Sequence, residues 1–394
     1  MSSSSTKSGD EEQTIANDLV VTKYNMAGEI VNKTLKLVIE KCVEGAKIHE
    51  ICLFGDKLIE DETSKVFKKN KEIKKGIAFP TCISVNNCVC HFSPLVSDHE
   101  ILLKSGDLVK IDLGAHVDGY IGVIAHTIVV NHISNNKKVD GRIADVILAA
   151  HYCAEACHRL IKNGNNNSQV TEAMQKICES FKCKPIEGIL MHQLKQHQIE
   201  GDKSIIQNPS DTQKQEHEKS EFKTYEVYGV DCLISTGDGK GKEMDARTTV
   251  YKKTDEIYNL KLKASRALYS EVDKKFGLMP FTLRGCEDEK KARMGLLECV
   301  NHKLMIPFPV LWEKEGEYVA HFKYTLLIMP NNNVRITSGP FILDNFESKF
   351  KIEDDSINAL LKSSTKRVIK KKKKKIDIVE LMKAAPLTIN GEAS

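Results

Sequence analysis

Residues 110–130 have the sequence KIDLGAHVDGYIGVIAHTIVV. Apolar and β-branched residues dominate both ends of this stretch, and Asp118 and Gly119 divide them. An Asp-Gly pair between two apolar runs is typical of a β-hairpin turn, because both residues tolerate a positive φ. The stretch therefore predicts two antiparallel strands, at about 108–113 and 120–130, with the carboxylate of Asp112 on the first of them.

Helical spacing of apolar residues is found on both sides of this hairpin. We expect helices at about 20–45, 48–67, 142–162 and 170–181, and further strands at 225–235, 248–251 and 318–329. A charged helical stretch at about 260–305 interrupts the second group of strands. Groups of helices and strands thus occur twice, which indicates a duplicated core rather than a doubly wound sheet with regular alternation.

Composition places the chain among globular proteins. Of its 394 residues, 41% are hydrophobic and 28% are charged, which is enough apolar material for a sizeable core. The start of the chain lacks the apolar segment of a signal peptide, and Gly122 and His126 interrupt the most apolar stretch. We therefore expect a soluble intracellular protein without membrane insertion, whose 12 cysteines are reduced.

Candidate metal ligands are scattered over the predicted strands. His91, Asp112, His192, His197 and Asp231 have suitable side chains, but their spacing forms no local metal-binding motif. Buried His and Asp residues usually find hydrogen-bond partners within a core, so a structural role is the simpler explanation for each one taken alone. Their order along the chain and their neighbours carry more information.

Five segments carry a resemblance to a known family: FPTCISVNNCVCHFSP, KIDLGAHVDGYIGVIAHTIVV, MHQLKQHQIEGDKSIIQNP, EVYGVD and GEYVAHFKYTLLIMP. They resemble the type II methionine aminopeptidases, and more closely a non-peptidase branch of that superfamily, the proliferation-associated proteins that bind ErbB receptors. The resemblance extends from Gln13 to Lys375. It implies an α+β pita-bread fold, with two pseudo-symmetric halves around a curved antiparallel sheet and a helical insertion in the second half.

Composition and the same resemblance together divide the chain into three parts, because the first residues are Ser-rich and charged without apolar periodicity. We expect residues 1–14 to be a disordered N-terminus and 15–345 to be the pita-bread domain, with its helical insertion at about 258–308. Residues 346–394 would be a C-terminal tail with a basic run at 362–376. Beyond Lys375 the sequence departs from the branch that it resembles, so no role is carried over to that end.

In the aminopeptidases that this sequence resembles, two Asp, one His and two Glu hold two divalent metal ions, which activate a water molecule. Only two of these five ligands keep their identity in this chain. The corresponding residues, here called the degenerate metal-site positions, are Asp112, Val123, His192, Asp231 and Lys323. Two histidines of the aminopeptidase substrate pocket correspond to His91 and Glu200.

The charge at these positions argues against metal binding. Asp112, Asp231 and Lys323 together carry a net charge of −1, whereas four carboxylates balance two divalent ions. An ammonium group ~4 Å from a dication costs roughly 8 kcal/mol at an effective dielectric constant of ~20. We expect Lys323 to form an internal ion pair with Asp112 or Asp231 instead.

The chain is therefore predicted to have no catalytic residues and to bind no metal or other cofactor. The alternative is an active metal-dependent methionine aminopeptidase that uses one metal ion on Asp112, His192 and Asp231.

Residues 362–376 form a basic run without a single acidic residue. Residues 1–361 sum to a net charge of −3, so the positive charge of the chain is concentrated in this run. Such a run binds RNA phosphates through counterion release and also resembles a nuclear or nucleolar import signal, while a solvated tail without partners is the alternative. Its nine bases are Lys362, Lys366, Arg367, Lys370, Lys371, Lys372, Lys373, Lys374 and Lys375.

Two weaker patterns remain. The sequence INALL contains Ile357, Leu360 and Leu361, a candidate coregulator-binding box, although an ordinary amphipathic turn is the simpler explanation. The sequence GDGKGK at 237–242 is rich in glycine but matches no established phosphate-binding motif, so a loop is the simpler explanation there as well.

These observations predict a non-catalytic aminopeptidase-like protein that associates with RNA and ribosomes and regulates growth, translation, rRNA processing and transcription. The resemblance implies ribosomal RNA and ribonucleoprotein particles as partners, together with receptor cytoplasmic tails and transcriptional corepressors. It also implies a cytoplasmic and nuclear location with nucleolar accumulation.

Overall fold

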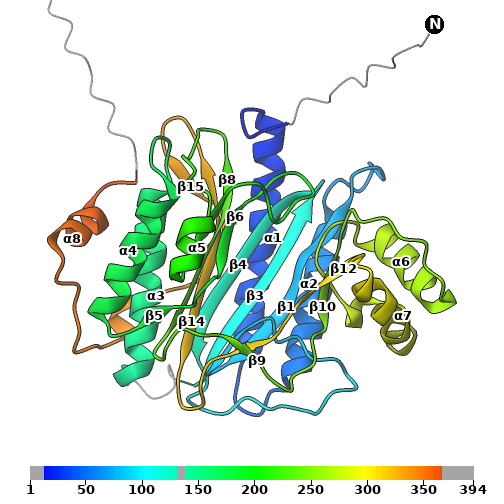
Figure 1. The fold of residues 1–394 in the computed structure, drawn as a ribbon, viewed down its shortest axis with the longest axis horizontal. Coiled ribbons are helices and arrows are strands. Elements are labelled where there is room, and N and C mark those ends of the chain that lie inside the picture. The colour runs from blue at the N-terminus through cyan, green and yellow to red at the C-terminus, as the bar shows by residue number, and fades with distance from the viewer. Residues whose placement is uncertain (1–12, 132–137, 366–394) are drawn as a thin grey trace, which may run out of the picture.

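The computed structural model describes residues 13–131 and 138–365, so the predictions for the first 12 residues and for the bases from Lys366 onward lie outside it. A large antiparallel sheet runs through the middle of the molecule (Figure 1). In the described ranges it has nine strands, in the order β1-β3-β4-β14-β8-β6-β7, with β15 paired to β14 and β5 paired to β8. The strands β4 and β14, which join its two halves, are about 200 residues apart in the chain.

The first half of the sheet contains the predicted hairpin. Its elements are α1 (Asp18–Lys41), α2 (Ile48–Lys65), β1 (Lys75–Val85), β2 (Cys88–Cys90), β3 (Leu108–Val117) and β4 (Tyr120–Val129). The turn between β3 and β4 places Asp118 and Gly119 at positive φ, as the sequence predicts. Helix α1 approaches β4 closely because residue 122 is a glycine, whose missing Cβ would lie 3.0 Å from the backbone nitrogen of Gly28.

The second half repeats the arrangement of two helices on antiparallel strands. Its elements are α3 (Gly141–Leu160), α4 (Asn167–Ser180), β5 (Lys184–Pro185), β6 (Leu190–Gln193), β7 (Ser204–Ile206), α5 (Asp211–Glu216), β8 (Val227–Ser235), β14 (Val319–Ile328) and β15 (Asn333–Arg335). Strand β8 begins two residues later than predicted, because Tyr225 has a positive φ of 73° and cannot continue a strand.

The two faces of the sheet carry different side chains, because successive side chains of a strand point to opposite faces. One face packs against helices and the other does not. In β3 the odd-numbered residues Val109, Ile111 and Leu113 pack against α1 and α2. In β8 and β14 the even-numbered residues, such as Val230 and Phe322, pack against α3 and α4. The opposite face of all these strands is therefore turned away from the helices and is free to carry polar side chains.

Threonine side chains complete the seam between the two halves. Strands β4 and β14 pair directly only at Lys323 with Ala125 and at Tyr324 with Ile124. On one side of this ladder, the Thr127 hydroxyl accepts from His321 N at 2.7 Å and donates to His321 O at 2.8 Å. On the other side, the Thr325 hydroxyl accepts from Val123 N at 2.9 Å. Side chains thus replace backbone partners where the strands diverge.

A helical insertion lies between β8 and β14, and its helices form one edge of the molecule (Figure 1). This part of the chain contains β9 (Lys242–Glu243), β10 (Val250–Lys253), α6 (Lys263–Lys275), β11 (Phe281–Thr282), the 3₁₀ turn η2 (Leu283–Gly285), α7 (Glu289–Asn301), β12 (Met305–Phe308) and β13 (Leu311–Trp312). The continuous helical stretch predicted at 260–305 is wrong in its middle. Helix α6 ends before Gly277, which has a φ of 61°, and Pro280 follows.

The described chain closes with the turn η3 (Leu343–Asn345) and helix α8 (Asp355–Lys362), which packs on α3 and α4. Asp354 caps this helix, because its carboxylate accepts hydrogen bonds from the backbone nitrogens of Ser356 and Ile357. No helix in the described ranges is both long enough and apolar enough to cross a membrane.

Candidate functional site

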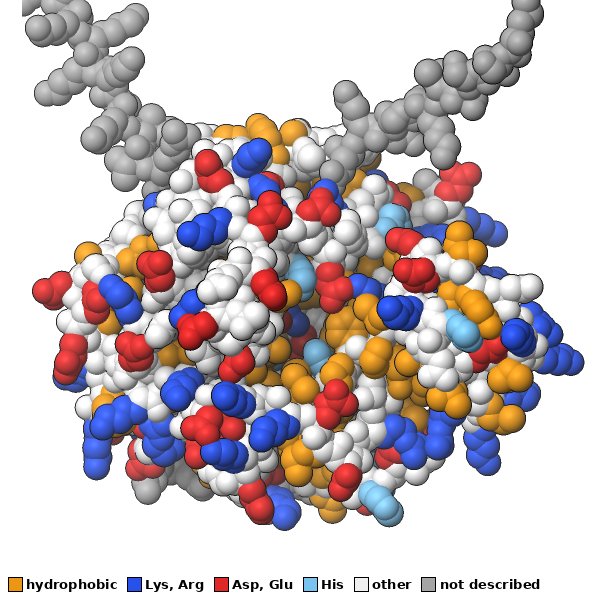
Figure 2. All heavy atoms as spheres, in the orientation of Figure 1, with side chains coloured by type: hydrophobic (Ala, Val, Ile, Leu, Met, Phe, Trp, Pro, Cys, Tyr) orange, Lys and Arg blue, Asp and Glu red, His pale blue; other side chains and the backbone are white. Residues whose placement is uncertain are grey.

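A cavity of about 280 Å³ lies on the face of the sheet that is turned away from the helices. Figure 2 shows a hollow near the middle of the molecular surface with hydrophobic side chains gathered beside it, while charges of both signs are spread over the rest. All seven expected site residues line the cavity. Five of them lie on β3, β4, β6, β8 and β14, and His91 and Glu200 lie in the loops after β2 and β6. The fold therefore brings together residues that are up to 232 positions apart in the chain, from His91 to Lys323.

The register of four strands aligns the charged residues of the cavity in one row. Asp112 on β3 pairs with Ala125 on β4, Ala125 pairs with Lys323 on β14, and Lys323 pairs with Asp231 on β8. Residues that pair in this way have side chains on the same face of the sheet. Because Ala125 is short, the side chain of Lys323 can cross β4 and reach Asp112.

Lys323 forms the expected internal ion pair, and it does so with both carboxylates. Its Nζ lies 2.8 Å from Oδ2 of Asp231 and 3.0 Å from Oδ2 of Asp112, and 5.2 Å from the centre of the Phe79 ring. Burial opposes the charge of Lys323, but the two carboxylates outweigh burial and raise its pKa above the ordinary value. The lysine is therefore a fixed cation.

Asp231 has a second partner that the sequence did not suggest. Nε2 of His321 lies 2.7 Å from its Oδ1, and the His321 side chain is almost fully buried. Burial alone would raise the pKa of Asp231, but Lys323 and His321 hold it well below the usual range. Within the described part of the chain, Oδ1 of Asp112 is buried without a hydrogen-bond partner.

His91 is held by backbone and aromatic contacts. Its Nδ1 lies 3.0 Å from the carbonyl oxygen of Pro309, so this nitrogen carries the proton, and its ring contacts Phe79 and Phe308. Burial lowers the pKa of His91, although the bond to Pro309 opposes this. The imidazole is therefore neutral near pH 7 and leaves Nε2 as an acceptor.

His192 and Glu200 also line the cavity, and they differ in their hydrogen-bond and ion-pair partners. Burial lowers the pKa of His192, and its Nδ1 is buried without a partner among the residues that the structure describes. Glu200 forms an ion pair with Lys252 of β10. Its carboxylate is therefore held by a cation from a strand of the helical insertion.

The residues present do not fit the two-metal centre that the resemblance implies. The ammonium group of Lys323 bonds to both carboxylates that would have to face the ions, and the buried Val123 offers no donor atom. In the described ranges, no three His, Cys, Asp or Glu side chains are grouped so that they could hold a metal ion. A cation supplied by the chain itself thus stands among the carboxylates.

The two weaker sequence patterns have structural partners. Ile357 of the candidate coregulator box is buried, and Leu360 and Leu361 pack against the core beneath α8, which favours the amphipathic turn over an exposed box. In the glycine-rich loop, Gly239 N donates to Oε2 of the buried Glu313 at 2.8 Å. A carboxylate in that position repels phosphate, which favours a structural loop.

Strand β3 also buries a lysine that the sequence analysis did not single out. Lys110 is 1% exposed, and its Nζ donates to the carbonyl oxygen of Asn86 at 2.7 Å. Burial lowers the pKa of Lys110 from 10.5 to about 7, against the smaller opposing effects of Cys88, Cys90 and Asp107. The amine therefore changes its charge near neutral pH in the folded protein.

Lys110→Met is expected to stabilise the protein relative to wild type most strongly below pH 7. The unfolded lysine keeps its proton up to about pH 10.5 and the folded one only up to about pH 7, so the penalty for burying the charge declines between these values. The difference in free energy of unfolding between variant and wild type, measured by urea denaturation, should therefore shrink across that window. The exposed Lys57 of α2 gives a matched control, Lys57→Met, which should show no such trend. A pH-independent difference for Lys110→Met would contradict the assignment.

Two contacts of the cavity were missed from the sequence. His321 could have been found, because it lies two residues before Lys323 on the same strand and so shares its face. Lys252 gave no local signal, because only the fold of the insertion brings it to Glu200.

The class of protein follows from this fold and from the sequence together. Residues 22–232 match the model of Metallopeptidase family M24. The chain belongs to this family, and the predicted α+β pita-bread fold is confirmed.

Individual relatives show which members of family M24 this chain is similar to. ERBB-3 BINDING PROTEIN 1 of Solanum tuberosum is 50% identical over 334 residues, which cover 84% of each chain. Curved DNA-binding protein of Schizosaccharomyces pombe is 44% identical over 367 residues, 92% of this chain and 95% of that one. The solved structure of a thermophilic Arx1 matches with a TM-score of 0.84 and 32% identity, over 89% of this chain and 100% of its own. The predicted resemblance to the ErbB-receptor-binding branch is thereby confirmed.

Proposed function

We propose that this chain is a non-catalytic member of family M24 that works by binding. The observation that carries the proposal is the position of Lys323, whose ammonium group bonds to Asp112 and Asp231 at the place where catalytic relatives would hold metal ions. A metal ion would have to displace this cation from two buried carboxylates, and the geometry thus opposes metal-dependent peptide hydrolysis. In this proposal, the ion pairs of Lys323 with Asp112 and Asp231 stabilise the fold and take no part in catalysis.

The partner is RNA, including ribosomal RNA and ribonucleoprotein particles, and the role is regulation of growth, translation, rRNA processing and transcription. The nine bases of residues 362–376 support this, because they offer phosphates a dense positive charge. The name of the Schizosaccharomyces pombe relative records binding to a nucleic acid, and that of the Solanum tuberosum relative binding to ErbB-3. Receptor tails and transcriptional corepressors are further proposed partners, and cytoplasm, nucleus and nucleolus are the proposed locations.

The purified protein is expected to retain no stoichiometric divalent metal and to release no methionine from a Met-Ala-Ser peptide. Elemental analysis after mild purification and a peptide assay with added cobalt or manganese measure these outcomes. Val123 and Lys323 are the physical reason, because one lacks a donor atom and the other is a cation. Turnover comparable to that of a true aminopeptidase would overturn the non-catalytic proposal.

A gain-of-binding variant makes this test sharper. Val123→Asp combined with Lys323→Glu restores two carboxylates and removes the cation, so it should bind manganese or cobalt more tightly than wild type in calorimetric titration. Lys57→Glu, on the exposed surface of α2, adds charge without touching the cavity and should leave metal binding unchanged.

Replacing Lys370 to Lys375 with Gln should weaken RNA binding and flatten its dependence on salt. For single strands, each neutralised phosphate contributes about −0.7 to the slope of log affinity against log salt, so about five engaged bases give a slope near −3.5. Fluorescence anisotropy with a labelled RNA at several salt concentrations measures both quantities. Truncation after Ser364 removes eight of the nine bases and should act in the same way on all RNAs. Unchanged affinity and slope in both variants would show that the tail is not the RNA-binding element.

A further inference from the structure

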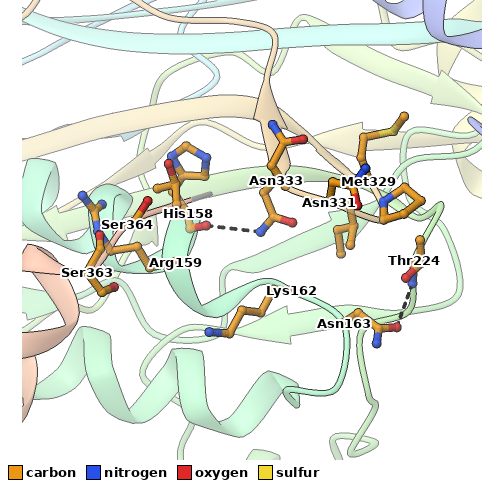
Figure 3. Close-up of a pocket in the computed structure, with 14 residues that line it drawn as sticks. His158, Arg159, Lys162, Asn163, Thr224, Met329, Asn331, Asn333, Ser363 and Ser364 are labelled. Atoms are coloured by element: carbon orange, nitrogen blue, oxygen red, sulfur yellow. Dashed lines mark hydrogen bonds between the residues drawn. The ribbon is translucent and has the colours of Figure 1, made fainter. Parts of the chain in front are cut away.

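A second cavity, of about 390 Å³, lies where the end of α3 meets the end of β14 (Figure 3). Its walls come from the last turn of α3 and the loop after it, from the β14–β15 turn at residues 328–333, from Thr224 and from residues 363–365. Its volume lies within the range of small-ligand sites, roughly 300–1,000 Å³. One nucleotide fits a space of this size.

The chemistry of the walls fits a phosphate and a base. None of the 14 lining residues is acidic, and two are cations, Arg159 and Lys162. Arg159 is already paired with Glu155 on the same helix, whose Oε2 lies 2.7 Å from its Nη1, so Lys162 is the cation available to a phosphate. Lys162 is exposed and has no carboxylate within ion-pair distance among the residues that the structure places. The amides of Asn331 and Asn332 are exposed at the opposite wall and offer both donors and acceptors. Phosphates are bound by such cations, and base edges are read by such amides.

Hydrogen bonds fix the frame of the cavity. Asn163 Oδ1 accepts from Thr224 N at 3.0 Å. Asn333 Nδ2 donates to the carbonyl oxygens of His158 at 3.3 Å and Ile161 at 2.5 Å, where α3 ends. Arg159 Nε donates to Ser363 O at 3.2 Å, which ties the segment after α8 to α3. The walls are thus pre-organised, which reduces the entropic cost of binding a ligand.

The position of the cavity connects it to the basic run. Residues 363–365 form one wall. The next residue in the sequence is Lys366, the first of the remaining eight bases of the basic run. On the other side, Thr224 also borders a smaller cavity of about 240 Å³, together with Lys223, Tyr225 and Glu226, whose carboxylate is paired with Lys203. Lys223 is exposed, and the Tyr225 ring is 39% exposed on a backbone with a φ of 73°. The surface formed by the two cavities therefore presents the cations Lys162 and Lys223, the amide of Asn331 and the ring of Tyr225.

We propose that this surface binds single-stranded RNA, with one nucleotide seated in the outer cavity between Lys162 and Asn331. Tyr225, which borders the adjoining smaller cavity, offers a stacking surface to a neighbouring base. The inference rests on the proposed function, because it locates on the folded body a site for the RNA that the basic run attracts.

The test measures binding of a fluorescein-labelled single-stranded RNA of about 12 nucleotides to the full chain at several salt concentrations. Lys162→Glu should weaken binding by about tenfold and reduce the salt slope by about 0.7, because it removes one phosphate contact. Tyr225→Ala should also weaken binding by about tenfold but leave the salt slope unchanged, because stacking releases no counterions. Lys57→Glu introduces the same change of charge on α2 and should change affinity by less than about twofold.

The outcomes separate this inference from the proposed function. If the unaltered chain binds no RNA, both are overturned. If the Lys370 to Lys375 replacement abolishes binding while Lys162→Glu and Tyr225→Ala behave like Lys57→Glu, the cavity is not an RNA site and the tail proposal stands. Thermal melting of each variant must match wild type for the comparison to count. If polyglutamate of equal charge displaces the RNA as well as unlabelled RNA does, the surface recognises an acidic polypeptide and the nucleotide assignment is wrong.

Discussion

Lys323→Met is expected to lower the free energy of unfolding by about 3–5 kcal/mol, because it leaves buried carboxylates without their cation. Asp112 and Asp231 both bond to Nζ of Lys323, at 3.0 and 2.8 Å, and their side chains are 5% and 13% exposed. Met has nearly the length of Lys, so little packing is lost. Urea denaturation of variant and wild type at pH 7 measures the difference, and equal stability would mean that the lysine is not required to neutralise this centre.

A rescue variant identifies the cause of the loss. Adding Asp112→Asn and Asp231→Asn to Lys323→Met removes the unpaired charges and should restore most of the stability. The pH dependence offers a second check. The pKa of Asp231 is lowered in the folded wild type, so its stabilising effect is present above the ordinary value of 3.8 and is lost as the pH falls through the folded pKa. That stabilising effect is constant between pH 7 and about 4, so the part of the Lys323→Met deficit that it accounts for should shrink only as the pH falls below 3.8.

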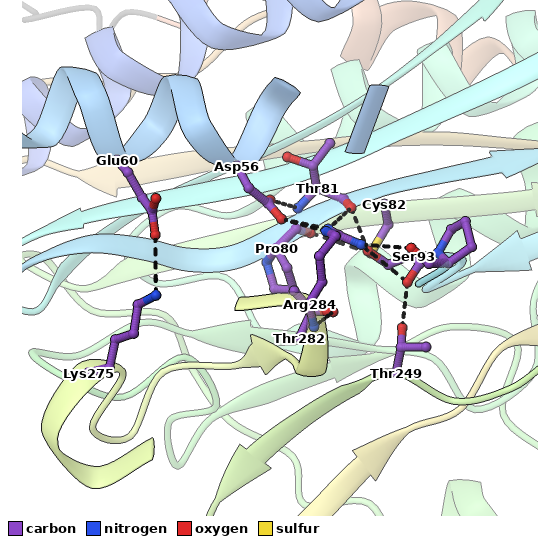
Figure 4. Close-up of polar contacts among 11 residues, drawn as sticks. Asp56, Glu60, Pro80, Thr81, Cys82, Ser93, Thr249, Lys275, Thr282 and Arg284 are labelled. Atoms are coloured by element: carbon purple, nitrogen blue, oxygen red, sulfur yellow. Dashed lines mark hydrogen bonds and ion pairs between the residues drawn. The ribbon is translucent and has the colours of Figure 1, made fainter. Parts of the chain in front are cut away.

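Arg284→Met is expected to destabilise the protein by about 3–5 kcal/mol and to loosen the helical insertion. Figure 4 shows Arg284 reaching from the insertion into contacts with Asp56 and Ser93. Its Nη2 lies 2.5 Å from Oδ2 of Asp56, and its Nη1 donates to Ser93 Oγ at 3.0 Å and to Pro94 O at 3.1 Å. The side chain is 3% exposed. Its loss leaves a largely buried carboxylate on α2 and several carbonyl oxygens without their donor.

The same interface provides a matched control. Lys275 of α6 lies 3.9 Å from Glu60 of α2, and the two side chains are 45% and 50% exposed (Figure 4). Lys275→Met also removes a cation between the insertion and α2, but an exposed ion pair of this kind contributes no more than about 1 kcal/mol. Urea denaturation and limited proteolysis of residues 250–310 should therefore separate the two variants. Equal stability and equal cleavage would show that the Arg284 contacts do not hold the insertion in place.

Local sequence patterns predicted most helices and strands, and the residue identities indicated the chemistry that each position can offer. Apolar runs on both sides of the Asp118-Gly119 turn predicted β3 and β4, and helical spacing predicted α1 to α4, because these patterns reflect local backbone geometry. The identities of Val123 and Lys323 indicated a missing ligand and an added cation. Gly277 and Pro280 are local signals that a helix ends, and they lie between α6 and α7. The prediction of one continuous helical stretch did not take them into account.

Contacts between residues that are distant in the chain depend on the fold of the whole sheet. Lys323 and Asp112 are 211 residues apart, and they meet because β14 lies between β4 and β8 with a register that no local pattern encodes. The ion pairs of Glu200 with Lys252 and of Arg284 with Asp56 depend in the same way on how the insertion docks. Packing also placed Ile357 in the core and assembled the outer cavity from four separate segments. Local propensity acts over a few residues, whereas these contacts depend on the closure of the whole sheet.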